Sequence, residues 1–314
     1  MPTLARMETT VATADGLALL LREWVVPAPH GTVLLVHGLG EHVGRYLHLA
    51  AQLNAWGWTV AGYDQRGHGA SPGARGRLTH PHDLLDDLGR VLARVQDSHP
   101  GPHVLLGHSL GGLVVARYAA EALDNAPPEA WYRPVDALVL SSPALDPGMN
   151  GVQKLLLAVL GRLAPGIGVA NGLDPAWISR DPRVVADYVS DALVHDRVSP
   201  RLARFIVDAA ALVRSRARDW RVPTLLLYAG SDRCVAPAGS AAFAAAAPPG
   251  VVTVRAYPAL YHEIFNEPER ARVLQDLRAW LAARAPTAQA RNPADGTGSS
   301  AHLNSITRSA EDSP

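Results

Sequence analysis

The sequence predicts an α/β fold with a mostly parallel sheet, helices on both faces of that sheet and a helical cap insertion. Short apolar runs rich in β-branched residues recur along the chain, and helical patterns separate them. The 314 residues, 48% of them hydrophobic, are enough to bury one large core. Because strands that alternate with helices form crossover units, the alternation favours a parallel sheet.

Two antiparallel strands are expected at the beginning. Residues alternate between apolar and polar over 7–13 and 17–26, and Ala14-Asp15-Gly16 lies between these segments. Asp-Gly supplies the positive φ of a tight hairpin turn. The run Thr32–Val36 has no polar alternation, which indicates a strand buried on both faces and the start of the parallel sheet.

Further strand and helix patterns follow in alternation. The expected strands are Thr59–Tyr63, Val104–Leu106, Ala137–Leu140, Thr224–Tyr228 and Val251–Tyr257. The expected helices are Tyr46–Ala55, Asp83–Asp97, Leu110–Leu123, Ala238–Ala246 and Glu269–Arg284. Residues from about 147 to 218 interrupt this alternation with helical segments that contain several prolines. We therefore expect a single domain, 1–285, with a cap of these residues inserted between two strands. Residues 286–314 have hardly any large apolar side chain and predict a disordered C-terminal tail.

Composition excludes several classes of function. Charge is balanced at 29 basic and 29 acidic residues, so no basic face for nucleic acid is expected. The single cysteine, Cys234, rules out an internal disulfide and a cysteine metal cluster. No signal peptide pattern and no stretch of 18 uncharged apolar residues occurs. We therefore predict a cytoplasmic protein without cofactor or metal; oligomeric state is left open.

A nucleophile elbow is the sharpest local signal. Gly107-His108-Ser109-Leu110-Gly111 follows an expected strand directly and precedes an expected helix. Such a turn exposes the serine hydroxyl, and only small neighbours let the strand and the helix pass closely. The pattern predicts the α/β-hydrolase fold with Ser109 as its nucleophile.

A serine nucleophile needs a base and an acid, which follow it along the chain on this fold. His262 lies in a loop between a late strand and a helix and is the expected base; His195, inside the expected cap, is the competitor. Asp232, which follows the strand Thr224–Tyr228, is the expected acid, and Asp146 is the alternative.

Backbone N–H groups should meet the negative charge that develops on the attacked carbonyl. Leu110, directly after the nucleophile, is one expected donor. The second is Leu39 in His37-Gly38-Leu39-Gly40, the loop after the strand Thr32–Val36.

Together with the elbow, several motifs resemble the monoacylglycerol lipase and lysophospholipase family from about Thr9 to Ala283. They are His37-Gly38-Leu39-Gly40-Glu41-His42, Arg45-Tyr46, Asp64-Gln65-Arg66-Gly67-His68-Gly69-Ala70-Ser71, Gly107-His108-Ser109-Leu110-Gly111-Gly112, Gly230-Ser231-Asp232-Arg233 and His262-Glu263. The resemblance implies a serine hydrolase that needs no cofactor and cleaves glycerol monoesters or lysophospholipids. It places Ser109, Asp232 and His262 on the catalytic triad and Leu39 and Leu110 at the oxyanion hole.

Other residues in these motifs have a structural interpretation. Glu41, His42 and Arg45 are expected to shape the loop that carries Leu39. Asp64, Arg66 and His68 are expected to form a turn held by internal hydrogen bonds, and Cys234 to be a buried bystander.

Substrate identity depends on the cap, where no motif matches. The apolar segment 152–163 is expected to line an acyl pocket, to contact a lipid surface or to pack on the body. Alternatives on the same fold are a short-chain carboxylesterase, a perhydrolase and a serine aminopeptidase, the last of which needs acidic residues such as Asp174, Asp181, Asp187 and Asp191 near the site. A hydrolase-fold binding protein would normally lack a triad member.

Overall fold

The computed structural model describes residues 6–123 and 127–285. Its strands are β1 (Arg6–Ala12), β2 (Ala18–Trp24), β3 (Thr32–Val36), β4 (Thr59–Tyr63), β5 (His103–His108), β6 (Ala137–Ser141), β7 (Val169–Ala170), β8 (Arg197–Val198), β9 (Thr224–Ala229) and β10 (Val252–Tyr257). Its α-helices are α1 (Leu47–Ala55), α2 (Asp83–Ser98), α3 (Leu110–Ala120), α4 (Gly151–Leu163), α5 (Pro182–Ser190), α6 (Pro200–Ser215), α7 (Pro237–Ala246) and α8 (Arg270–Ala282).

The main sheet has eight strands in the order β1-β2-β4-β3-β5-β6-β9-β10. The pairs β1–β2 and β2–β4 are antiparallel, and all other pairs are parallel. The turn between β1 and β2 contains Gly16 at φ 85°, as the Asp-Gly signal predicts. Every residue of β3, β4, β5 and β6 is buried, which explains why these strands have no polar alternation.

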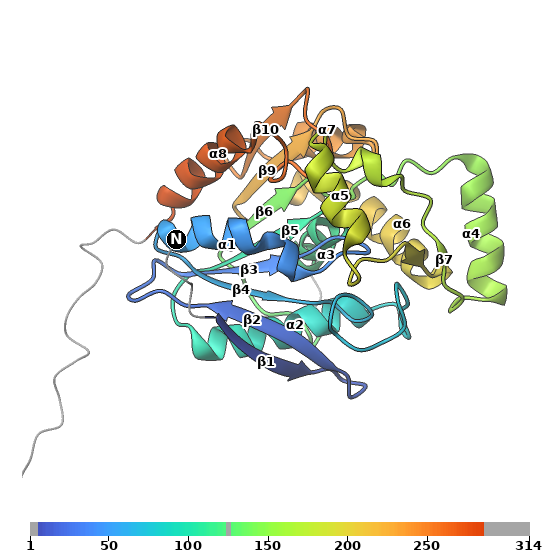
Figure 1. Ribbon diagram of the computed structural model, residues 1–314, viewed down its shortest axis with the longest axis horizontal. Helices are drawn as coiled ribbons and strands as arrows, with labels where there is room; N and C mark the ends of the chain where they lie inside the picture. Colours follow the sequence, from blue (N-terminus) through green and yellow to red (C-terminus); the bar gives the residue numbers. More distant parts are fainter. Residues whose placement is uncertain (1–5, 124–126, 286–314) are drawn as a thin grey trace, which may run out of the picture.

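Helices cover both faces of the sheet (Figure 1). One hydrophobic cluster joins side chains of α2, α3, α6 and α7 to the sheet, and the other joins α1 and α8 to the opposite face. The predicted α/β-hydrolase architecture is confirmed. Because the inner strands are parallel, β3, β5, β9 and β10 bring their carboxyl ends to one edge, and the loops after them carry the candidate site residues.

The chain between β6 and β9, residues 142–223, holds α4, α5, α6 and the two-stranded sheet β7–β8. We call it the β6–β9 segment. Helix α4 projects from the body at the right of Figure 1, whereas α5 and α6 lie closer to the main sheet. Short β7 and β8 have no counterpart in the prediction because two residues carry no readable periodicity. The predicted disordered tail, 286–314, lies outside the described residues.

Candidate active site

Ser109 occupies a strained turn between β5 and α3. Its φ of 52° lies in the left-handed region, which serine rarely adopts. The Ser109 N–H donates to the Ser141 carbonyl at 3.0 Å, and the Ser109 carbonyl accepts the N–H groups of Leu113 and Ala144, each at 3.0 Å. These three backbone bonds hold the nucleophile elbow in its strained conformation.

Glycines on both sides of Ser109 allow the elbow to form. A methyl group on Gly107 would collide with the carbonyl of Gly111, and one on Gly111 would collide with the Val36 carbonyl at the end of β3. Backbone atoms cannot move aside as side chains can. The requirement for small residues at 107 and 111 is therefore steric, as the motif indicates.

The loop after β3 places Leu39 beside the elbow. The Glu41 carboxylate fixes this loop: it accepts the Gly38 N–H at 2.6 Å, the Tyr46 hydroxyl at 2.6 Å and an Arg45 N–H at 2.8 Å. Leu110, the first residue of α3, has no carbonyl partner for its N–H within the helix. The two expected oxyanion donors thus belong to neighbouring loops, and Leu39 and Leu110 both line a cavity with Ser109.

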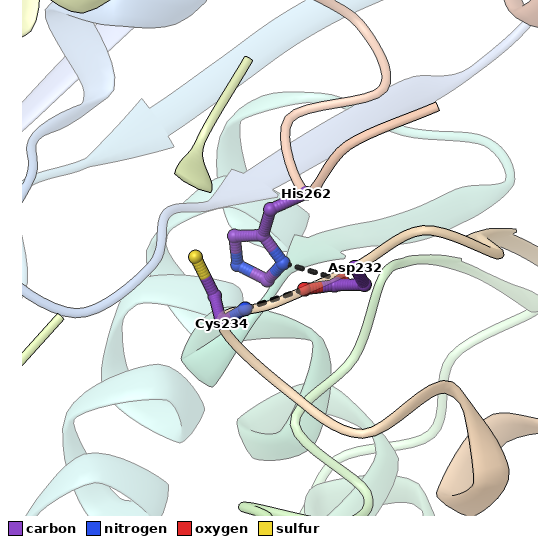
Figure 2. A group of neighbouring side chains, drawn as sticks. All are labelled: Asp232, Cys234 and His262. Carbon is purple, nitrogen blue, oxygen red and sulfur yellow. Dashed lines mark hydrogen bonds and ion pairs between the residues drawn. The ribbon is translucent and has the colours of Figure 1, made fainter. Parts of the chain in front are cut away.

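Asp232 and His262 come together from the loops after β9 and β10 (Figure 2). Nδ1 of His262 donates to Oδ2 of Asp232 at 2.7 Å. Oδ1 of Asp232 accepts the N–H groups of Cys234 at 2.8 Å and Val235 at 3.0 Å, so the carboxylate is fixed in orientation. Because Nδ1 carries the proton, Nε2 keeps its lone pair and can accept another proton.

The charges around His262 change the pKa of its imidazole. Burial disfavours its charged form, but the Asp232 carboxylate and its hydrogen bond outweigh burial and raise the pKa of His262 above the usual value. His108 lies beside it, with ring centroids 4.7 Å apart. Burial lowers the pKa of His108 to about 3, so this second ring stays neutral. His262 is therefore the imidazole of this pair that can take up a proton near neutral pH.

Cys234 lies close to the acid and the base (Figure 2). The donor atoms of Asp232, Cys234 and His262 all lie within 4.8 Å of one another, a spacing that a metal ion could use. However, burial and the neighbouring Asp232 raise the pKa of the thiol, which disfavours the thiolate that a metal ligand or a nucleophile requires. The chemistry of the trio fits proton transfer better than metal binding.

The two competing candidates have other partners. The Asp146 carboxylate accepts the N–H of Gly148 at 2.9 Å within its own turn. Nε2 of His195 is 3.1 Å from the Gly67 carbonyl, and its Nδ1 accepts the Arg197 N–H at 3.1 Å. Burial lowers the pKa of His195 to about 4. Asp232 and His262 are hydrogen-bonded to each other, whereas Asp146 and His195 have other partners.

The turn after β4 is structural, as its motif predicts. Asp64 accepts the N–H groups of Val43 at 2.8 Å and Ala70 at 2.9 Å. Arg66 forms a double hydrogen bond to Asp87, with distances of 2.6 Å and 2.8 Å. Nδ1 of His68 is 2.9 Å from the Arg66 carbonyl.

Two cavities meet at Ser109. One contains His262 and has a volume of about 330 Å³; we call it the polar cavity because its wall includes Glu41, Asp174, Tyr188, Asp191, His195, Asp196 and Glu263. The apolar side chains of Leu173, Ile178, Val189 and Val194 line it as well. The other, of about 590 Å³, extends under α4; we call it the apolar cavity because its wall includes Leu110, Met149, Leu156, Leu157, Leu160, Trp177 and Ile206, although Gln153, Asp232 and Arg233 also line it. Both cavities are bordered by Leu39, Ser109, Asn171, Leu173 and Cys234. Sequence reasoning identified the apolar contribution of α4 but missed Tyr188 and Asp196, because nothing in their local pattern predicts where they point.

The fold, the elbow and the paired acid and base define an α/β-hydrolase. Residues 27–269 match the family described as "Serine aminopeptidase, S33". The chain is 38% identical over 282 residues to the monoacylglycerol lipase of Mycolicibacterium smegmatis, covering 88% of this chain and 97% of the relative. It belongs to the monoacylglycerol lipase family of α/β-hydrolases and is a carboxylic ester hydrolase.

Solved structures agree with this assignment. The monoacylglycerol lipase of Paleococcus ferrophilus superimposes with a TM-score of 0.72 and 33% identity, covering 90% of this chain and 99% of that one. A soluble variant of the monoglyceride lipase of Saccharomyces cerevisiae, in complex with a substrate analog, gives a TM-score of 0.79 at 22% identity, covering 91% and 98% of the two chains, which supports the fold.

Proposed function

We propose that the enzyme hydrolyses monoacylglycerols through an acyl-enzyme on Ser109. The observation that carries the proposal is the position of Ser109 between two cavities: one has the leucines of α4 in its wall and suits the acyl chain, and the other has five carboxylates in its wall and suits glycerol. In this reaction Ser109 Oγ attacks the ester carbonyl while Nε2 of His262 takes its proton. The N–H groups of Leu39 and Leu110 stabilise the oxyanion, and Asp232 stabilises the charged imidazole.

The second half of the reaction uses the same groups. His262 returns the proton to the departing glycerol oxygen, which leaves through the polar cavity. It then removes a proton from water, whose oxygen attacks the acyl carbonyl; as the bond between the acyl group and Ser109 Oγ breaks, His262 gives this proton to Oγ and the fatty acid is released.

Charge in the polar cavity favours glycerol over a phosphate-bearing head group. Five carboxylates line it (Glu41, Asp174, Asp191, Asp196 and Glu263), and none of its described lining residues is lysine or arginine. Arg45, behind this wall, neutralises part of the charge through Glu41 and Glu263. A phosphate would meet net negative charge, so we favour monoacylglycerols over lysophospholipids.

An ester panel tests the substrate. Each methylene buried in the apolar cavity contributes ~0.8 kcal/mol, or about fourfold in affinity. We expect kcat/KM on monoacylglycerols to rise from acetyl to decanoyl and then level off, with decanoyl lysophosphatidylcholine a poorer substrate. Ser109→Ala should lower turnover by at least ~10³ and abolish fluorophosphonate labelling. Equal rates on acetyl and decanoyl esters would leave a short-chain carboxylesterase as the better assignment.

An aminopeptidase remains the second candidate, because Asp174 and Asp191 line the polar cavity and could hold a free amine. Both carboxylates have partners already: Asp174 accepts the Ala176 N–H at 2.9 Å, and Asp191 lies 2.8 Å from His42. An aminoacyl anilide assayed beside decanoylglycerol separates the two activities.

We also propose that the β6–β9 segment acts as the cap and contacts lipid surfaces. No helix in the described ranges combines the length and the apolar character needed to cross a membrane. Exposed apolar side chains nevertheless gather on this segment, among them Leu163, which is 79% exposed, and Ile167, which is 59% exposed. We place the enzyme in the cytoplasm, at the periphery of a membrane, a location that suits its unpaired Cys234.

A further inference from the structure

The loop that carries Leu39 is docked on the β6–β9 segment. The His195 N–H donates to the Gly40 carbonyl at 2.8 Å. Nε2 of His42 lies 2.8 Å from Oδ2 of Asp191, and the Arg45 guanidinium stacks 4.7 Å from the centre of the Tyr188 ring. Residues 40–45 and 188–195, far apart in the sequence, thus meet at three points.

The contact between His42 and Asp191 is fixed at both ends. Nδ1 of His42 accepts the Gly44 N–H at 3.2 Å, so the ring proton is on Nε2 and is donated to Asp191. Oδ1 of Asp191 accepts the Leu193 N–H at 2.8 Å. The His42 side chain is buried, and that of Asp191 is 28% exposed. Both side chains therefore sit in defined positions, and the bond requires no charge on the imidazole.

Leu39 lies between two anchors. On one side, the His37 carbonyl accepts a hydrogen bond from the Gln65 side chain at 2.7 Å, which ties the start of the loop to the turn after β4, and Glu41 accepts the Gly38 N–H within the loop. On the other side, the chain turns at Gly40, with φ 79°, and passes directly to the contacts with the β6–β9 segment. Because an oxyanion donor must be placed to within a fraction of an ångström, the second anchor is as important as the first.

We propose that Asp191 is a positioning residue that, through His42, holds the Leu39 N–H where it meets the oxyanion. The inference rests on the proposed function. It implies that the part of the β6–β9 segment directly after α5 contributes to catalysis and also covers the substrate. Asp191 also borders the polar cavity, and a direct contact with glycerol is the rival explanation that the experiment must separate.

Two substrates separate these roles. Decanoylglycerol occupies both cavities, whereas p-nitrophenyl acetate has no glycerol and no long chain but needs the same oxyanion hole. Asp191→Ser keeps a side-chain oxygen for the Leu193 N–H but is too short to reach His42. Asp191→Asn has the required length but only one oxygen for the two donors, the Leu193 N–H and the Nε2–H of His42. His42→Phe breaks the link from the other side. Asp187→Ser, at an exposed position of α5, is the matched control.

We expect Asp191→Ser and His42→Phe each to lower kcat by about 10- to 100-fold on both substrates, with KM little changed. Removal of a whole oxyanion donor lowers kcat by about 10²–10³, and displacement of one should have a smaller effect. Asp191→Asn should lose less activity than Asp191→Ser, because its single oxygen can keep the bond to His42 while giving up the bond to Leu193. Asp187→Ser should keep full activity. The Asp191→Ser/His42→Phe double variant should lose no more than the worse single variant, because both break one link.

Three results would overturn the positioning role: losses confined to KM for decanoylglycerol, additive losses in the double variant, or full activity in both single variants. Circular dichroism melting separates misfolding from mispositioning, since the variants should melt within a few degrees of wild type. Failure of the wild-type enzyme to react with a fluorophosphonate would instead contradict the proposed function. A wild type that reacts and single variants that react at the same rate would refute the positioning role alone.

Discussion

At the scale of single residues, the site depends on conformations and protonation states that neighbours impose. Ser109 adopts its positive φ because three backbone hydrogen bonds hold it there. His262 presents Nε2 as a base because Asp232 binds the proton on Nδ1. The sequence placed each of these residues after a strand of recognisable pattern, and the structure has them in the turns and loops that follow β5, β9 and β10. The sequence could not predict that His108 would lie against His262 with a pKa lowered to about 3, because that depends on burial.

Asp232→Asn should change both the rate and its pH dependence. Catalysis needs neutral His262, whose pKa Asp232 raises, so activity declines as pH falls through this raised value. Removing the negative charge lowers the pKa of His262, and the acid limb of the kcat/KM profile should move to lower pH. We expect kcat to fall by up to ~10⁴ because the favoured tautomer is lost.

The kcat/KM profile is measurable with p-nitrophenyl acetate at concentrations well below its KM. Asp146→Asn is the control and should leave both the rate and the acid limb unchanged, since the Asp146 carboxylate accepts the Gly148 N–H of its own turn, a bond that asparagine can keep. An acid limb that stays in place in Asp232→Asn would show that another group controls the pH dependence.

At the scale of elements, close approach between β3, β5 and α3 creates the elbow. Gly111 lies so near the end of β3 that an added methyl group would overlap the Val36 carbonyl. The motif Gly-x-Ser-x-Gly made this packing predictable. By contrast, the internal arrangement of the β6–β9 segment was not predictable, because β7 and β8 have two residues each and His42 and Asp191 are 149 residues apart.

Gly111→Ala should destabilise the protein by at least ~3 kcal/mol, because relief of the overlap requires movement of α3 against the sheet. The free energy of unfolding can be measured by urea denaturation monitored by circular dichroism. Gly161→Ala is the matched control: an added methyl group there meets nothing within 4 Å, and alanine favours the interior of helix α4 by up to ~1 kcal/mol. Equal stability of the two variants would contradict the packing argument.

At the scale of the whole molecule, the sheet was predictable and the surface was not. Alternation of apolar and polar residues for β1 and β2, and apolar runs for the other strands, predicted the position of every described strand of the main sheet to within a few residues. Which side of α4 faces the apolar cavity depends on tertiary packing: Leu157 and Leu160 line the cavity, while Leu163 points into solvent. An amphipathic pattern predicts that a helix has an apolar face, but it does not identify what that face packs against.

Leu163→Asp combined with Ile167→Asp should weaken attachment to lipid. Each side chain contributes ~1.5–3 kcal/mol when fully buried, so we expect binding to phosphatidylcholine vesicles, measured by cosedimentation, to fall by at least about tenfold. Hydrolysis of dissolved p-nitrophenyl acetate should be unchanged. Leu47→Asp, at a 45% exposed position of α1, is the control and should bind vesicles normally. Undiminished binding by the double variant would place the lipid contact elsewhere.

Because two cavities meet at one serine, the two products leave the enzyme in a fixed order. In the proposed reaction glycerol departs from one compartment while the fatty acyl group is still anchored in the other, and the vacated space admits the next acceptor. Water is one such acceptor, and a small alcohol dissolved in the medium is another. The enzyme would then also synthesise esters. The yield of methyl or ethyl ester should increase with the ability of methanol or ethanol to compete with water for the emptied space.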